Sequence, residues 1–389
     1  MGDKMKKYLY IFAGLILLLF STAIILFISS RHPDNYLYDF GGYYKNNQIL
    51  TMYESNNFVY ALVRNHEITV DNFDDDDCWD DMLNIVVIDD KFNLIEHIEI
   101  EETQTLENDG QGIRTNEFSM SSYQDNDDIY ISISLYDENY MIIFDTLTNT
   151  YVLNETEMYL QTFIIVNDKI KGVGSVYNKS SNLYDVIYYE LSQSLIVENE
   201  ILIGDIDNVY QKPLINSDFI FVQGDLNAKS FSWNSISRYN ISTQSVDIIA
   251  DEDSYNIGFH YINQDNIIYS IHHIENENII IEYYDEDGAL IQSSTNDEFP
   301  IVSIDNSRFI FMQHDVDFQQ QIIRILDQDD NEEIVLEFDQ RMYLYEIYYF
   351  NDSVYLIADM IESDLDKLFF GSHQAYIIKY SISELNALK

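Results

Sequence analysis

The residues best suited to bind an ion form one acidic stretch, Asp71–Asp81, which reads DNFDDDDCWDD. Carboxylate oxygens in a flexible loop are the ligands that Ca²⁺ prefers, at about 2.3–2.6 Å. The spacing does not match an EF-hand, because the loop glycine and the glutamate at position 12 are both missing. Two interpretations stay open: a solvated acidic loop, and a calcium site whose ligands would be Asp74, Asp75, Asp76, Asp77, Asp80 and Asp81.

The two tryptophans are the candidate ligand contacts. Trp79 and Trp233 both fall in segments with the composition of loops. Exposed aromatic rings at the ends of strands suit the binding of peptide or sugar, whereas a role in core packing is the alternative. Calcium is the one ion that the sequence suggests, and no organic cofactor is expected.

No catalytic residue can be assigned from the sequence, because no nucleophile elbow, phosphate-binding glycine loop, dinucleotide fingerprint or zinc spacing occurs. His272 and His273 are neighbours in a predicted strand, so their side chains should face opposite ways. Asp285–Gly288 lies between two predicted strands, where Asp-Gly is typical of a tight hairpin. The acids around Cys78 raise the pKa of a thiol, which argues against a nucleophilic cysteine.

The charge of the chain excludes two classes of partner. Its 389 residues carry 68 Asp and Glu against 20 Lys and Arg, a formal net charge of −48. Such a field repels nucleic acid and anionic lipid, whose binding depends on Lys and Arg. It also pushes the folded chain apart unless cations screen it, so we expect thermal stability to rise with salt or calcium.

A membrane anchor is predicted near the N-terminus. Residues 8–28 contain no charge, and 21 helical residues span about 31 Å against a hydrocarbon core of about 30 Å. Lys4, Lys6 and Lys7 precede this segment and Arg31 follows it, so the positive-inside rule places residues 1–7 in the cytoplasm. Residues 29–35 form a linker, and residues 36–389 lie outside the cytoplasm. A cleaved signal peptide is the alternative, although no A-x-A-like site follows.

A single cysteine allows no disulfide within the chain, which favours a bacterial cell membrane over eukaryotic secretion.

After the anchor, a turn of Asn and Asp followed by a short apolar run recurs seven times. The first apolar residues of these runs are Phe58, Ile129, Ile170, Phe219, Ile267, Phe309 and Val354. Five of the six gaps between them are 41–49 residues, a period typical of propeller blades. Each unit also holds a downstream hairpin, so the pattern predicts four antiparallel strands per unit. The first unit is lengthened by expected insertions at 71–83 and 101–118, and residues 36–44 could add an outer strand to the last unit.

The apolar patterns favour stacked blades. Residues 129–135 alternate apolar and polar, which predicts a strand with one wet face, whereas residues 219–222 are apolar throughout and require cover on both faces. The sequence therefore predicts an all-β protein, a β-propeller of seven four-stranded blades preceded by one N-terminal transmembrane helix. Two or three β-sandwich domains in a row are the alternative.

Two hairpins resemble those of seven-bladed β-propellers of the surface-layer, YVTN-repeat type: residues 141–152, MIIFDTLTNTYV, and residues 86–89 before Leu94 and Ile95. The resemblance covers residues from about 36 onward at the level of repeat pattern. The glycine- and proline-containing halves of that repeat are missing here, and a propeller fold names no activity.

Three functions fit this sequence. The first is an anchored, extracytoplasmic binding or scaffold module for a protein, peptide or cell-envelope polymer, using loops at one end of the ring. The second is a surface glycan hydrolase or lyase with acidic residues near the central channel. The third is a structural envelope protein whose acidic surface holds cations without a discrete ligand.

Overall fold

Strands are the only regular elements in the part of the chain that the computed structural model describes. These residues are 37–39, 47–69, 78–89, 93–106, 119–135, 138–206, 212–226, 235–250, 256–261, 267–275, 278–294, 298–303, 308–314, 321–327, 332–337, 342–350, 353–360 and 375–381. None of these residues forms a helix that could span a lipid bilayer. The predicted anchor, residues 8–28, lies outside the described residues.

The described strands form seven four-stranded antiparallel sheets. The first four in chain order are β2 (Asn47–Ser55), β3 (Phe58–Thr69), β4 (Cys78–Asp89), β5 (Leu94–Leu106); β6 (Ser119–Asp125), β7 (Asp128–Leu135), β8 (Glu138–Asp145), β9 (Thr150–Thr156); β10 (Thr162–Val166), β11 (Lys169–Asn178), β12 (Leu183–Ser192), β13 (Val197–Ile206); and β14 (Leu214–Ile215), β15 (Phe219–Gln223), β16 (Ile236–Asn240), β17 (Ser245–Ala250).

The remaining three are β18 (Asn256–Tyr261), β19 (Ile267–Glu275), β20 (Asn278–Asp285), β21 (Leu290–Ser294); β22 (Glu298–Ser303), β23 (Arg308–His314), β24 (Gln321–Asp327), β25 (Glu332–Glu337); and β26 (Met342–Phe350), β27 (Ser353–Met360), β28 (Ala375–Ser381), which β1 (Leu37–Asp39) joins.

The recurring Asn and Asp residues make the turn between the first and second strands of a sheet. Positive φ angles occur there at Asn56, Asn57, Asn126, Asn167 and Asp168. Asn and Asp tolerate this left-handed region better than other non-glycine residues, so the repeated turn has a conformational cause. Each of the seven apolar positions predicted from the repeat lies at or beside the first residue of a second strand, which confirms that part of the prediction.

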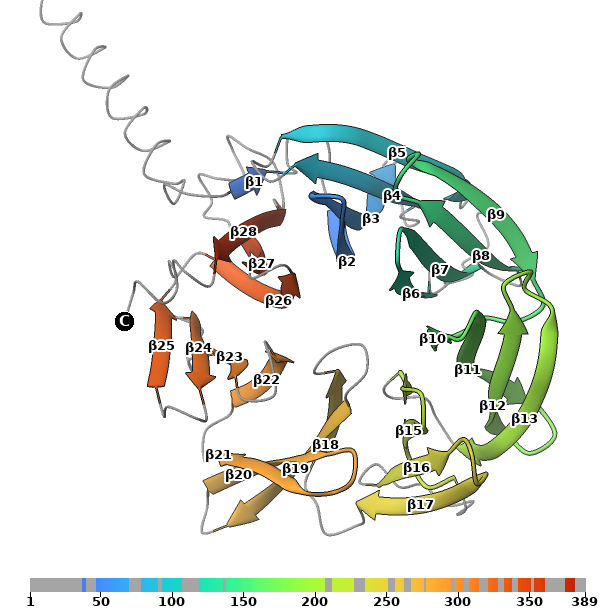
Figure 1. Ribbon diagram of the computed structural model, residues 1–389, viewed down its shortest axis with the longest axis vertical. Helices are drawn as coiled ribbons and strands as arrows, with labels where there is room; N and C mark the ends of the chain where they lie inside the picture. Colours follow the sequence, from blue (N-terminus) through green and yellow to red (C-terminus); the bar gives the residue numbers. More distant parts are fainter. Residues whose placement is uncertain are drawn as a thin grey trace, which may run out of the picture.

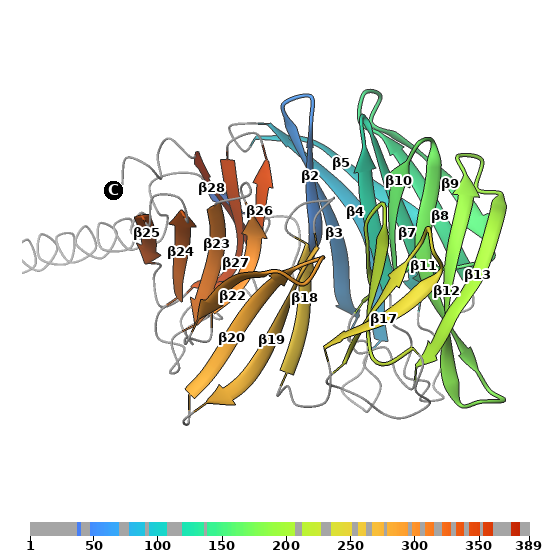
Figure 2. The same cartoon turned by 60° about the horizontal axis from the view of Figure 1, so that its bottom comes forward.

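The sheets stand around a central axis as a β-propeller, with the first strand of each toward the centre and the fourth at the perimeter (Figure 1). Inner strands of successive sheets contact one another, from β6 and β10 through to β22 and β26, and β26 in turn contacts β2. Figure 2 shows the same arrangement tilted so that the bottom of the view in Figure 1 comes forward. The all-β propeller prediction is therefore confirmed.

The N-terminal strand completes the last sheet. Leu37, Tyr38 and Asp39 of β1 pair with Ile378, Ile377 and Tyr376 of β28, so the order is β1-β28-β27-β26. The prediction that residues 36–44 add an outer strand to the last unit is confirmed. This sheet joins both ends of the described chain, and backbone pairing holds the ring closed there.

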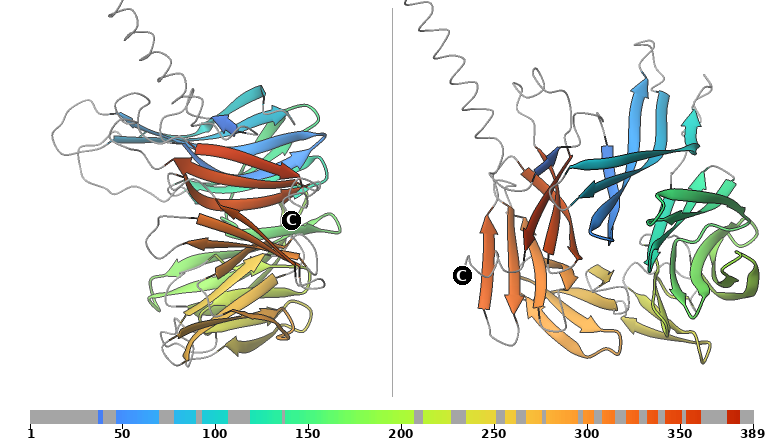
Figure 3. Two further views of the ribbon diagram at one scale, coloured as in Figure 1. Left: turned by 90° about the vertical axis from the view of Figure 1, so that its left-hand side faces the viewer. Right: turned by 45° about the horizontal axis from the view of Figure 1, so that its top comes forward.

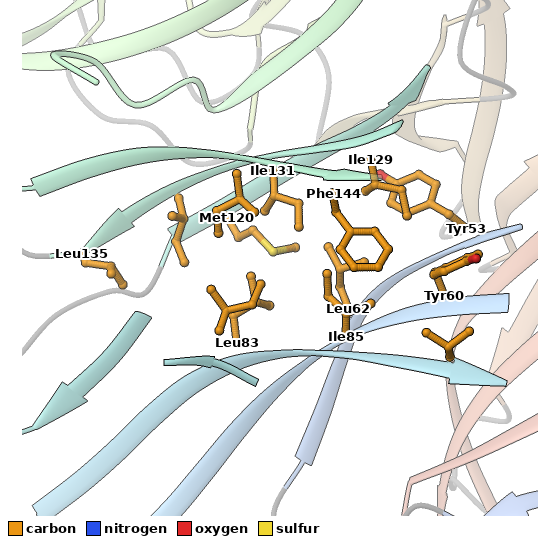
Figure 4. Packing of buried hydrophobic residues seen from close by; sticks show 14 residues of the cluster. Tyr53, Tyr60, Leu62, Leu83, Ile85, Met120, Ile129, Ile131, Leu135 and Phe144 are labelled. Atoms are coloured by element: carbon orange, nitrogen blue, oxygen red, sulfur yellow. The ribbon is translucent and has the colours of Figure 1, made fainter. Parts of the chain in front are cut away.

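Apolar side chains fill the seams between neighbouring sheets. In β3, Tyr60 and Leu62 pack toward sheet β6–β9, while Val59, Ala61 and Val63 pack toward Tyr355 and Ile357 of β27. Figure 4 shows the first of these seams, where the ring of Phe144 lies beside that of Tyr60. Because β3 is covered on both faces, its residues need no apolar–polar alternation.

The strand expected to have one wet face is buried on both faces. In β7, Ile129, Ile131 and Ile133 face one seam, and Ser132 between them is also buried. The Ser132 hydroxyl oxygen accepts a hydrogen bond of 3.0 Å from the Leu160 amide. Ser132 therefore satisfies a buried backbone amide instead of facing solvent. The prediction that this strand has one solvent-exposed face is wrong.

The two expected insertions are shorter than predicted. β4 begins at Cys78 and β5 continues to Leu106, so residues 78–83 and 101–106 belong to strands. The sequence pattern missed the start of β4 and the end of β5, because these segments are rich in charged and polar residues, whereas strands are recognised by their apolar residues. The rest of both insertions lies outside the described residues.

One glycine permits close packing between sheets β10–β13 and β14–β17. A Cβ added at Gly204 would lie 2.8 Å from both the Cβ and the carbonyl oxygen of Leu226. We expect Gly204→Ala to lower the free energy of unfolding by about 1–3 kcal/mol, because backbone must shift to admit the methyl group. Urea unfolding measures this. The control is Glu200→Ala, an exposed position of the same strand, and equal stability of the two variants would contradict the expectation.

Candidate binding surfaces

The up-and-down order of the strands gives the ring two different ends. Turns between first and second strands, and between third and fourth strands, meet at one end, which we call the turn end. Connections between second and third strands, and from one sheet to the next, lie at the opposite end, the loop end. Loops held by a rigid scaffold are the usual place for binding residues.

The β3–β4 hairpin projects from the loop end. Its two strands pair over 12 residues, against eight in β7–β8 and seven in β27–β28. Four or five additional residues at about 3.4 Å each extend the hairpin by roughly 15 Å. The left view of Figure 3 shows these blue and teal strands passing beyond the neighbouring sheets. This hairpin gives the loop end a raised edge.

The predicted site residues lie on or beside this hairpin. Trp79 is in β4 opposite Ile68 of β3, and Asp80 and Asp81 are opposite Glu67 and His66. The placement of Trp79 in a loop was therefore wrong, because the acidic run conceals the start of β4. The structure places these three residues on consecutive positions of a paired strand. Asp74, Asp75, Asp76, Asp77 and Trp233 lie outside the described residues.

Polar side chains join two sheets at the turn end. The Ser55 hydroxyl donates to Oδ1 of Asp127 at 3.2 Å, and the Thr146 hydroxyl donates to the Asp127 carbonyl oxygen at 2.7 Å. Beneath them, the Tyr60 hydroxyl donates to the Thr146 carbonyl oxygen at 2.9 Å. These bonds connect the β2–β3, β6–β7 and β8–β9 turns, so this part of the turn end is a fixed surface.

A row of three aspartates crosses sheet β6–β9 at the turn end. Asp128 is directly opposite Asp125 on one side and Asp145 on the other. Burial, followed by the charges of Asp145, Asp125 and Asp127, raises the pKa of Asp128. Asp145 behaves oppositely, because hydrogen bonds from Thr148 and the Leu147 amide lower its pKa. Sequence reasoning missed this row, since it appears only once strand register is known.

This row is not a metal centre. Within the described ranges, no group of three or more His, Cys, Asp or Glu side chains is arranged to hold a metal ion. The row is instead a place where like charges oppose one another across strands, which destabilises a sheet.

We expect Asp128→Asn to raise the free energy of unfolding by about 0.5–1 kcal/mol at pH 7. The raised pKa means that the folded state binds this proton more tightly than the unfolded state. The cost of the Asp128 charge is therefore absent in acid and appears as pH rises through the carboxyl range. Urea unfolding at pH 4 and pH 7 tests this, with the exposed Glu155→Gln as control. A stability gain that does not depend on pH would contradict the charge explanation.

A second carboxylate is held between sheets β14–β17 and β18–β21. Oε2 of Glu286 accepts a hydrogen bond of 2.5 Å from Nδ2 of Asn216, and Arg238 donates to the Glu286 carbonyl oxygen at 2.5 Å. Burial is the first cause that raises the pKa of Glu286, followed by the charges of Asp287, Asp218 and Asp285. Gly288 has a φ of +89°, and the predicted Asp285–Gly288 hairpin turn is confirmed. Through these two contacts, the β20–β21 turn links sheet β18–β21 to sheet β14–β17.

Acidic residues are scarce on the strands that line the axis. In the described inner strands, β2, β6, β10, β14, β18, β22 and β26, four residues are acidic, namely Glu54, Asp125, Glu298 and Glu346. His260 is their one histidine. Glu54 and Asp125 both lie beside turns at the turn end. The described channel wall therefore brings together no carboxylate pair with a histidine.

No family model and no curated protein matches this chain. Solved structures resemble it at low identity. The β-propeller domain of the Trilobed protease from Pyrococcus furiosus, which has an open velcro topology, gives a TM-score of 0.53 at 11% identity over 88% of this chain and 99% of that chain. Oligogalacturonate lyase in complex with manganese gives 0.51 at 9% identity, over 88% and 99%.

Acylaminoacyl peptidase from Pyrococcus horikoshii gives a TM-score of 0.52 at 10% identity, over 85% of this chain and 54% of that chain. At these identities the likeness concerns fold alone, and proteins with this fold include a protease domain, a lyase and a peptidase. The chain has the β-propeller fold.

Proposed function

We propose that this protein is a membrane-anchored, extracytoplasmic β-propeller of seven blades that acts as a binding or scaffold module for a protein, peptide or cell-envelope polymer. Residues 1–7 face the cytoplasm, residues 8–28 span the membrane, residues 29–35 are a linker, and residues 36–389 form the propeller. Each four-stranded sheet is one blade, and the pairing of β1 with β28 closes the ring.

One observation carries the binding function: the β3–β4 hairpin extends beyond its neighbours at the loop end. A hairpin that extends beyond its neighbours offers a large partner a place to bind, whereas a small substrate requires an enclosed pocket. Trp79 lies on this hairpin. The segment with Trp233 connects β15 and β16, and such a connection belongs to the same end of the ring. We propose both tryptophans as ligand contacts.

The tip of the same hairpin is the proposed calcium site. Asp74, Asp75, Asp76 and Asp77 fall between β3 and β4, where oxygen ligands can adapt to an ion. Asp80 and Asp81 are strand residues, so the flexibility expected of a calcium loop does not extend to them. Calcium would fix the tip and reduce repulsion between its carboxylates.

The alternative, a glycan hydrolase or lyase, requires acidic residues near the central channel. The described inner strands carry few carboxylates, and two of these four lie beside turns rather than along the wall. The fold of oligogalacturonate lyase is similar, but fold alone does not transfer an activity. These observations favour binding over catalysis.

Crosslinking in intact cells tests the proposed function. The full-length protein should recover a specific partner, which is lost when residues 70–77 are replaced by Gly and Ser and is reduced by Trp79→Ala. The control replaces Gln193 and Ser194, an exposed turn at the opposite end of the ring, by glycine. Recovery of the same partner by the 70–77 variant would contradict the assignment to the loop end. Turnover of a glycan by the soluble domain would favour the alternative.

A further inference from the structure

The outer edge of sheet β6–β9 differs from the other outer edges of the ring. β9 is last in the order β6-β7-β8-β9, and no described strand pairs with its free side. Figure 1 shows β9 at the perimeter. A free strand edge presents unpaired backbone N–H and C=O groups, on which another strand can assemble.

Bulges interrupt the ladders of four other outer strands. β5 and β13 each have two register shifts, and β17 and β21 have one each. A bulge bends and twists an edge and so makes strand addition unfavourable. β9 pairs with β8 over seven consecutive residues without a shift. β25 and β1 also pair without a shift, but over six and three residues, so β9 is the longest uninterrupted outer strand among the described sheets.

The side chains of β9 hold the strand in place while one side stays open. Tyr151 and Leu153 pack against the core shared with sheet β2–β5. The Tyr151 hydroxyl donates to Oε2 of Glu102 at 2.8 Å. Burial, followed by this hydrogen bond, raises the pKa of Tyr151 to about 12. Val152 between them remains 61% exposed. The strand is therefore preorganised, and its exposed valine offers apolar contact to an added strand.

Charge determines what can occupy this edge. Residues 119–156, which make up the sheet, contain seven Asp and Glu and no Lys or Arg. A second copy of the chain, with its own formal charge of −48, would be repelled. An extended segment rich in Lys or Arg would be attracted, and β9 itself has no lysine or proline to prevent pairing.

We propose that the free edge of β9 accepts an extended basic segment of another protein as a fifth strand of its sheet. Backbone hydrogen bonds to Thr150–Thr156 would provide the affinity, and Val152 with the seven carboxylates of the sheet would select alternating apolar and basic side chains. This surface lies on the perimeter, so it is separate from the loop-end surface and does not depend on it.

The test uses full-length protein in detergent and a fluorescent heptapeptide of alternating lysine and valine. We expect saturable binding by fluorescence anisotropy and slowed amide hydrogen exchange in residues 150–156. Val152→Lys should weaken binding at least tenfold, since it adds a cation at the centre of the edge. Leu202→Lys is the matched control, because Leu202 is also 61% exposed on an outer strand, the bulged β13. It should bind like the unchanged protein.

Two further peptides separate strand addition from simple charge attraction. A peptide of the same sequence that is N-methylated at alternate residues cannot form the ladder and should not bind. A glutamate–valine peptide should not bind either. Equal binding by the N-methylated peptide, equal loss in both lysine variants, no protection in residues 150–156, or no binding at all would each overturn the proposal. Self-association that Val152→Lys abolishes would also overturn it, in favour of a second copy.

Discussion

Replacement of Tyr60 by alanine should lower the free energy of unfolding of residues 36–389 by about 3–5 kcal/mol, as for other large aromatic residues in cores. Tyr60 has no exposed surface and contacts Phe144 edge-on, with ring centroids 5.7 Å apart. Its hydroxyl donates to the Thr146 carbonyl oxygen in the neighbouring sheet. Truncation therefore opens a cavity in the seam and leaves a buried carbonyl without this donor.

Tyr60→Phe separates the two contributions. It keeps the ring and removes the hydroxyl, so we expect a loss of about 1 kcal/mol. Urea unfolding followed by circular dichroism measures both variants. A loss for Tyr60→Ala no larger than for Tyr60→Phe would show that the seam is not packed as described.

Loss of the closing strand should destabilise the whole ring. A chain of residues 46–389 lacks β1, which forms three residue pairs with β28. If the pairs contribute about 1–3 kcal/mol in total, the melting temperature should fall by several degrees relative to residues 36–389. Amide exchange in residues 375–381 should also become faster, because the edge of β28 is then free.

Tyr38→Pro within residues 36–389 tests the same pairing with a minimal change. Proline has no backbone N–H and is disfavoured in a paired strand, and Tyr38 is the central residue of the three pairs. The variant should resemble the truncated chain in melting temperature and in exchange. A ring closed by β1 would be contradicted if both variants melt and exchange like the unchanged chain.

Local chemistry explains why much of the fold could be predicted. The Asn and Asp turns are recognisable because few residues tolerate positive φ, and they recur at a fixed spacing. The apolar run Phe219–Val222 correctly indicated a strand covered on both faces, since Ile220 and Val222 pack toward one seam and Phe221 toward the other.

Other features depend on contacts that are distant in sequence. The sequence pattern predicted that Ser132 faces solvent, because its hydrogen-bond partner, the Leu160 amide, is 28 residues away in the chain. Trp79 looked like a loop residue because the strand that contains it begins inside an acidic run. Asp125, Asp128 and Asp145 form a row only in the observed strand register. The edge of β9 is distinguished by its continuous ladder, since bulges interrupt the ladders of four other outer strands. Sequence periodicity reports burial, but it does not report which polar group finds which partner.

The measurement that tests the central claim most directly is the side of the membrane on which the propeller lies. Cys78 is the one cysteine, so Cys78→Ser gives a background for labelling. Leu147→Cys introduces a thiol at a turn where the native side chain is 66% exposed. In intact cells, a membrane-impermeant maleimide should label this thiol, whereas a thiol from Asp3→Cys should react only after the membrane is opened. Labelling of the Leu147→Cys thiol only after the membrane is opened would contradict an extracytoplasmic propeller.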